Sequence, residues 1–225
     1  MGQTISLTAA DGHRLTAYRA DPAGAQRGGL VVIQEIFGVN DHIRGVCDAF
    51  ADDGYRVVAP ALFDRAEPGI ALAYDADGMT RGRAFKAELG WDGPLADVAA
   101  AVAALKNDGP VAVVGYCWGG SVAWLAATRL AGLACVVGYY GGQIVDFKDE
   151  TPRCPVLLHF GETDAAIPLA AVEAIRAAHP EIPVHLYPGA GHGFNCEPRA
   201  DYHPESARLA RERTMAFLAR HIGAC

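Results

Sequence analysis

The sequence predicts an α/β domain built on a mainly parallel β-sheet with helices on both faces. Two observations support this fold class. Short, wholly apolar runs recur along the chain, and segments with helical periodicity separate them. Wholly apolar runs are typical of strands that are buried on both faces, as in parallel sheets covered by helices. With 225 residues and 51% hydrophobic side chains, we expect one domain over residues 1–225.

The N-terminal segment departs from this pattern. Residues 3–20 hold two short alternating runs on either side of Asp11-Gly12, a dipeptide typical of tight turns, and so predict an antiparallel hairpin at a sheet edge. The first wholly apolar strand follows at residues 30–33. A helix is expected after it, with Asp41 as a capping residue and Gly54 at its end.

Later elements alternate between strands and helices. Apolar strands are predicted near residues 55–60, 111–116, 133–139, 154–160 and 184–187, and helices near residues 92–105, from 118, from 168 and near 204–220. Residues 62–90 are the least regular, with a polar helical stretch at about 80–89. Because ligands of open parallel sheets lie beyond the carboxyl ends of the strands, such an excursion is expected to form a wall of the binding cleft.

One predicted strand breaks abruptly into a helix at Gly115-Tyr116-Cys117-Trp118-Gly119. This Gly-x-Cys-x-Gly spacing is that of a nucleophile elbow with cysteine in place of serine. A helix N-terminus favours thiolate over thiol, which would prepare the sulfur of Cys117 for attack. The alternative is that Cys117 fills core space, as buried cysteines usually do. Ser121 lies inside the following helix and is most simply a packing residue.

Two further residues follow predicted strands in the order expected of a hydrolase. Asp164 follows the strand at 154–160, and His192 follows the strand at 184–187, which gives the chain order nucleophile, acid, base. His192 would exchange the proton, and Asp164 would orient its imidazole. Taken singly, Asp164 could be a turn residue before Pro168, and His192 a surface or core histidine.

Together these residues resemble the dienelactone hydrolase (carboxymethylenebutenolidase) family along essentially the whole chain. The matching motifs are Gln34-Glu35-Ile36-Phe37-Gly38, Gly115-Tyr116-Cys117-Trp118-Gly119-Gly120, Gly138-Tyr139-Tyr140-Gly141, Asp164 and Gly191-His192-Gly193-Phe194. The resemblance implies an α/β-hydrolase fold without a large cap and a Cys117-His192-Asp164 triad. It also implies an oxyanion hole made by the backbone N–H groups of Trp118 and Ile36.

The resemblance further implies that Glu35 pairs with the resting thiol of Cys117 and takes part in its activation. A carboxylate beside the elbow can accept the thiol hydrogen bond and keep the sulfur protonated, which also protects it from oxidation. The alternative is that Glu35 caps the helix near Asp41, although it lies six residues before that position.

Substrate contacts are also implied by the family pattern. Arg81 stands where the family has an arginine that holds the substrate carboxylate, or it is a solvated helix-surface arginine. Two positions depart from the pattern: Cys196 replaces a second arginine, and Phe85 replaces a tyrosine. Arg199 is a candidate substitute for the missing arginine. With Phe37, which lies in the Glu35 motif, these residues form the expected substrate-binding set.

The amino-acid composition limits the classes of molecule that the protein is expected to bind. The net charge of -7 and the lack of basic clusters argue against nucleic acid. Residues 1–5 do not resemble a signal peptide and no long apolar run occurs, so a cytoplasmic protein without membrane contact is expected. The cysteines lack metal-ligand or disulfide spacing and are expected to be free thiols, with no metal and no cofactor; they are Cys47, Cys117, Cys135, Cys154, Cys196 and Cys225. A monomer is expected.

The resulting hypothesis is a hydrolase of small activated esters or enol-lactones, resembling dienelactone, that acts through a cysteine thioester. Two alternatives stay open. One is a general carboxylesterase or thioesterase with another natural substrate. The other is a non-catalytic or redox-sensing protein in which Cys117 is oxidised rather than acylated.

Overall fold

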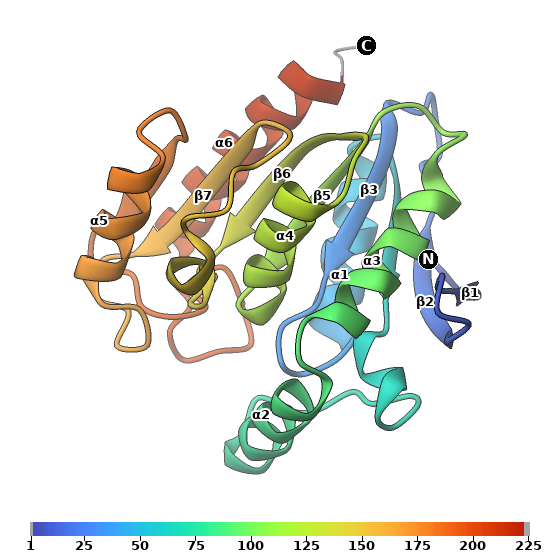
Figure 1. Cartoon of the computed structure of the whole chain (residues 1–225), viewed down its shortest axis with the longest axis horizontal. Coiled ribbons are helices and arrows are strands. Elements are labelled where there is room, and N and C mark those ends of the chain that lie inside the picture. Colours follow the sequence, from blue (N-terminus) through green and yellow to red (C-terminus); the bar gives the residue numbers. More distant parts are fainter. Residues whose placement is uncertain (1, 223–225) are drawn as a thin grey trace.

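The structure, a computed structural model, describes residues 2–222, which form an eight-stranded sheet covered by helices (Figure 1). The strands follow the order β1-β2-β4-β3-β5-β6-β7-β8 across the sheet. Their bounds are β1 Gln3–Thr8, β2 Arg14–Ala20, β3 Gly28–Ile33, β4 Tyr55–Pro60, β5 Val111–Tyr116, β6 Leu133–Tyr139, β7 Val156–Gly161 and β8 Val184–Tyr187.

The strand directions confirm the predicted architecture. β1 and β2 form an antiparallel hairpin, β2 pairs antiparallel with β4, and every pairing from β4 across to β8 is parallel. Because all parallel strands end at the same edge, the loops that follow β3, β5, β7 and β8 meet there.

Six α-helices lie within the described residues: α1 Asp41–Asp52, α2 Ala76–Leu89, α3 Asp92–Leu105, α4 Trp118–Arg129, α5 Leu169–Ala178 and α6 Pro204–Ile222. Short 3-10 helices occur at Leu62–Arg65 and Ile144–Phe147. In Figure 1, α3, α4 and α5 lie in front of the sheet and α1 and α6 lie behind it. The helix α2 projects beyond the carboxyl edge of the strands, at the bottom of the view.

Local capping explains where two helices begin. Asn40, rather than Asp41, caps α1, because its backbone is extended and its side-chain oxygen accepts from the Ile43 N–H at 3.2 Å. The helix predicted at about 80–89 starts earlier, where Asp75 accepts from the Gly78 N–H at 2.7 Å. Its poor helix formers obscured this start in the sequence.

Gly82 sets the position of α2. A Cβ atom built on Gly82 would lie 1.9 Å from the carbonyl oxygen of Ile36, so only glycine lets the helix approach the loop after β3 this closely. The segment that could not be assigned clearly from the sequence is therefore held against the carboxyl edge of the sheet.

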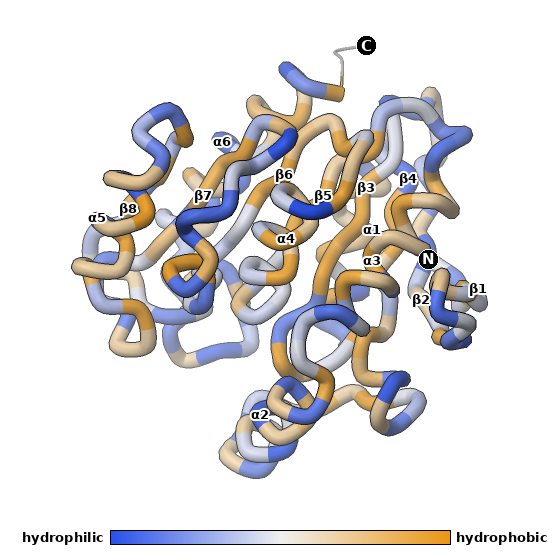
Figure 2. The backbone as a smooth tube through the Cα atoms, viewed as in Figure 1, coloured by the Kyte–Doolittle hydropathy of each residue, from blue (hydrophilic) through white to orange (hydrophobic). Residues whose placement is uncertain are grey.

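The core is formed by the central strands and the helices on them. Every residue of β3 and β5 is buried, and both strands stand out as apolar in Figure 2. None of the helices within residues 2–222 is long and apolar enough to cross a membrane. The described cysteines are free thiols as expected, and Cys225 lies outside the described residues.

Candidate active site

Cys117 lies at the sharp corner between β5 and α4. Its φ of 55° and ψ of -118° are strained for a residue with a side chain. A Cβ atom on Gly115 would lie 1.9 Å from the Gly119 carbonyl oxygen, and one on Gly119 would lie 2.4 Å from the Gln34 carbonyl oxygen. The flanking glycines are thus sterically required, and the corner has the geometry of a nucleophile elbow.

The structure brings the three residues of the predicted triad together. The Nε2 atom of His192 lies 3.1 Å from the Sγ atom of Cys117, and its Nδ1 atom lies 2.7 Å from Oδ2 of Asp164. The other Asp164 oxygen, Oδ1, accepts from the backbone N–H groups of Ala166 and Ile167 at 2.8 and 3.1 Å. These bonds fix the carboxylate so that Oδ2 faces the imidazole.

The electrostatics of this group favour a protonated imidazole. Burial alone would lower the pKa of His192, but the adjacent Cys117 sulfur and the Asp164 carboxylate raise it to about 10. At neutral pH the imidazole then carries a proton, and the sulfur beside it faces a positive charge. The ring of Tyr140, a buried residue with a φ of 38°, lies 5.3 Å from the imidazole and covers it on one side.

A cavity of about 310 Å³ opens beside the sulfur, and Cys117, His192, Ile36 and Trp118 line it. Within the described part of the chain, the backbone N–H groups of Ile36 and Trp118 donate to no protein acceptor. The N–H of Trp118 also belongs to the first turn of α4, where backbone donors lack helical partners. Two free donors therefore lie in the same cavity as the sulfur.

Positive side chains line the cavity, but Arg81 is not among them. Met79, Arg83 and Lys86 face the cavity from α2, spaced by four and three residues along one helical face. Arg81 lies on the opposite face, exposed and 3.7 Å from Glu67. The structure thus places Arg81, the expected substrate contact, away from this cavity and places Arg83 and Lys86 on it. Their i, i+3 spacing was the available signal in the sequence.

Lys86 is the cation with the most altered environment. Its half-buried position lowers the pKa of its ammonium group, and Arg83 adds to this effect while Cys117 opposes it. No carboxylate within residues 2–222 forms an ion pair with Lys86. Its charge is therefore available to a ligand in the cavity.

Three other expected substrate contacts, Phe85, Phe37 and Cys196, are not among the residues that line this cavity. Phe85 packs 5.2 Å from Phe63, which stacks on Trp118. Phe37 is buried 4.5 Å from the ring of Tyr74. Cys196 is completely buried. Through Phe63, Phe85 supports Trp118, which is a lining residue. The sequence alone does not distinguish a residue that supports the lining from one that contacts a ligand.

Glu35 is completely buried after β3, but its carboxylate does not pair with the Cys117 sulfur. Its Oε2 accepts from the Tyr74 hydroxyl at 3.0 Å, and its Oε1 accepts from Arg199 Nη1 at 3.4 Å. Arg199 also lines the cavity. Burial opposes the charge of Arg199, yet Glu35 raises its pKa. In this structure the Cys117 sulfur contacts His192, and the Glu35 carboxylate instead accepts from Tyr74 and Arg199.

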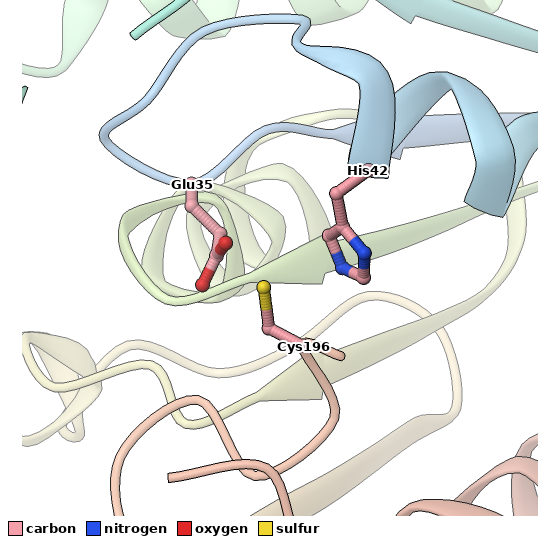
Figure 3. Close-up of side chains that lie close together, drawn as sticks. All are labelled: Glu35, His42 and Cys196. Atoms are coloured by element: carbon pink, nitrogen blue, oxygen red, sulfur yellow. The ribbon is translucent and has the colours of Figure 1, made fainter. Parts of the chain in front are cut away.

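One group of side chains behind the cavity has the chemistry of a metal site. Ligand atoms of Glu35, His42 and Cys196 lie within 4.8 Å of one another. In Figure 3 the carboxylate of Glu35 and the imidazole of His42 converge on the sulfur of Cys196 from two separate segments. No sequence pattern indicated this cluster, because the three residues lack any characteristic spacing.

Known proteins match this chain over nearly its whole length. A carboxymethylenebutenolidase of Pseudomonas putida is 35% identical over 226 residues, which cover 96% of this chain and 95% of that protein. A crystal structure from Klebsiella pneumoniae has 30% identity and a TM-score of 0.84, covering 97% of this chain and 99% of the other. A dienelactone hydrolase-like promiscuous phosphotriesterase from metagenomic libraries shares the fold at 19% identity and a TM-score of 0.76, with 98% of each chain covered.

The sequence model of the dienelactone hydrolase family matches residues 15–222, which run from the second residue of β2 to the end of α6. The match therefore includes the elbow, the loops that bear Asp164 and His192, and the Glu35 segment. By this match and the whole-length relatives, the protein is a hydrolase, and the chain belongs to the dienelactone hydrolase family.

Proposed function

We propose that the protein hydrolyses small activated esters or enol-lactones through a thioester on Cys117. The main support is a chain of two contacts: His192 Nε2 lies 3.1 Å from Cys117 Sγ, and His192 Nδ1 lies 2.7 Å from Asp164 Oδ2. Cys117 and His192 line a cavity of about 310 Å³. A hydrolytic site needs this combination of a nucleophile, an oriented base and room for a small substrate.

In the proposed reaction, the sulfur of Cys117 attacks the ester carbonyl carbon and forms the C–S bond. The tetrahedral anion collapses with loss of the C–O bond, and the leaving oxygen takes a proton from the imidazolium of His192. Neutral His192 then removes a proton from water, which attacks the thioester. Breaking the C–S bond releases the acid and restores the paired sulfur and imidazolium.

The backbone N–H groups of Ile36 and Trp118 would bind the oxyanion. Both lack protein acceptors and line the cavity beside the sulfur, which supports this role. Because they are backbone groups fixed by the loop after β3 and the first turn of α4, they need no rearrangement during the reaction. One such donor typically contributes about 3–4 kcal/mol to transition-state stabilisation.

We also propose that the substrate carries an acidic group. Arg83 and Lys86 place two cations on the α2 wall of the cavity, and Glu35 holds Arg199 on another side. The name of the Pseudomonas putida relative indicates a lactone that bears a carboxylate, which agrees with this lining. Neutral esters or thioesters are the second candidate, favoured by the position of Arg81 outside the cavity.

Glu35 would act here as a positioning residue. Its contacts with Tyr74 and Arg199 support a role in holding the Arg199 guanidinium at the cavity. Pairing of Glu35 with the resting thiol would require a change in the present contacts of the Glu35 carboxylate or of the Cys117 sulfur.

The nucleophile is tested by replacing Cys117 with alanine. We expect turnover of an enol-lactone and of p-nitrophenyl acetate to be abolished. Mass spectrometry of the unmodified chain during turnover of a slow ester should show an acyl adduct on Cys117. Wild-type rates in Cys117→Ala would exclude the thioester mechanism, and an adduct on another residue would reassign the nucleophile.

The substrate class is tested by a matched pair on the two faces of α2. Lys86→Met should raise KM for the carboxylate-bearing lactone by about tenfold, the loss of roughly one charged contact, and leave p-nitrophenyl acetate little affected. Arg81→Met removes a cation from the same helix outside the cavity and should change neither substrate. Equal effects of Lys86→Met on both substrates would favour the neutral-ester candidate.

A further inference from the structure

A cluster of two buried residues and the half-buried His42 combines three types of metal-binding atom. Glu35 supplies a carboxylate oxygen, His42 an imidazole nitrogen and Cys196 a sulfur, all within 4.8 Å of one another. Figure 3 shows the three side chains directed toward a common point, Glu35 from the loop after β3, His42 from the start of α1 and Cys196 from the loop before α6. The cluster is thus held by separate elements of the fold.

We propose that Glu35, His42 and Cys196 form a binding site for a divalent cation of the zinc class. Sulfur, imidazole and carboxylate ligands are those that Zn²⁺ and Co²⁺ accept, whereas Mg²⁺ and Ca²⁺ prefer oxygen alone. Three protein ligands leave a fourth tetrahedral position for water. Zinc–ligand distances of about 2.1–2.3 Å correspond to ligand atoms about 3.4–3.8 Å apart, so the side chains would move inward by about 1 Å.

An unpaired polar atom of His42 also supports a bound ion. Its Nε2 atom is buried and has no hydrogen-bond partner among the described residues. Buried polar atoms without partners are uncommon in folded proteins, and each one calls for an explanation. A cation bound to this ring, with the other ligands already beside it, would satisfy the imidazole.

A second cavity provides an access route. It has a volume of about 610 Å³, lies between α1 and α6, and includes His42 in its lining. Asn195 and Glu197, the neighbours of Cys196 in the sequence, also line it, as does Asp41. Neither Asp41 nor Glu197 forms an ion pair within residues 2–222. Their charges would attract a cation to this opening.

Binding would exchange one set of contacts for another. The Cys196 thiol releases its proton to solvent as the metal–sulfur bond forms, and the thiolate and the Glu35 carboxylate together balance the charge of the ion. The long 3.4 Å contact between Arg199 and Glu35 is the interaction most easily given up. Arg199 would then keep its full charge toward the catalytic cavity that it lines.

Cobalt is a suitable probe because a thiolate ligand gives a near-ultraviolet charge-transfer band and a tetrahedral site gives intense visible bands. On titrating the whole protein with Co²⁺, we expect both bands, with release of one proton per ion bound. Cys196→Ser should remove the charge-transfer band, and His42→Gln should weaken binding at least about tenfold, since even second-shell changes weaken metal sites by that amount. Added Zn²⁺ should displace the cobalt.

Two matched thiol variants distinguish this site from others. Cys117→Ser and Cys154→Ser each remove one free thiol outside the cluster and should keep the band. Loss of the band in Cys117→Ser would place the metal on the catalytic pair with His192 and overturn the proposal. Loss in Cys154→Ser, or no band in the unaltered protein, would also overturn it. Circular dichroism of each variant checks folding, and His42→Gln leaves every thiol in place.

Discussion

Replacing Asp164 with asparagine removes the charge beside His192 with little change in shape. An asparagine side chain can still accept from the N–H groups of Ala166 and Ile167, which bind Oδ1 at 2.8 and 3.1 Å. The fold should therefore be kept. The substitution removes the charge-assisted hydrogen bond that His192 Nδ1 donates to Asp164 Oδ2 over 2.7 Å. The Asp164 carboxylate in this bond is shielded from water.

A hydrogen bond to a charged group contributes about 1.5–3 kcal/mol, which corresponds to a fall in the pKa of His192 of roughly one to two units. The same energy predicts a loss of about 10- to 150-fold in kcat/KM if the reaction depends on the imidazolium. NMR titration of the imidazole and hydrolysis of p-nitrophenyl acetate measure the two effects. An unchanged His192 pKa in a folded Asp164→Asn variant would refute this account of the site.

Three further outcomes follow from the same geometry. Cys117→Ser should lower the pKa of His192, as measured by NMR, because the Cys117 sulfur is the group that raises this pKa most. The imidazole of the variant would then lose its proton at a lower pH than in the unaltered protein. Gly119→Ala should abolish activity or folding, because its Cβ would lie 2.4 Å from a backbone oxygen; a folded, active variant seen by circular dichroism and ester hydrolysis would contradict this. Arg65→Met should lower the free energy of unfolding in urea by about 3–5 kcal/mol, because it leaves the fully buried Asp97 carboxylate, 2.7 Å from Arg65, without its ionic partner. The double variant Arg65→Met with Asp97→Leu should recover much of that loss. No recovery would argue against the ion pair as the cause.

The candidate catalytic residues at the strand ends could be predicted because each is marked by the sequence immediately around it. Cys117, Asp164 and His192 each follow an apolar run, and parallel strands necessarily end at one edge of the sheet. The tight glycine spacing around Cys117 gave the corner itself. The distances among the three side chains depend on loop conformation, and the sequence held no measure of them.

The residues of α2 that line the cavity were harder to predict, because they depend on how the helix is rotated about its own axis. A helix places residues two apart on nearly opposite faces, so Arg81 and Arg83 have different surroundings although they are neighbours in the sequence. The helix begins at Ala76, earlier than its composition suggested, and the Gly82 contact with Ile36 then fixes which face turns inward. The partners of Glu35 likewise come from distant segments, Tyr74 and Arg199.

The glycine at position 82 brings two parts of the site into direct contact. Because α2 touches the Ile36 carbonyl with no room for even a methyl group, the helix that carries Lys86 packs directly on the residue whose N–H would bind the oxyanion. This contact therefore sets the spacing between a cation that would recognise one end of a substrate and a donor that would stabilise its reacting carbonyl.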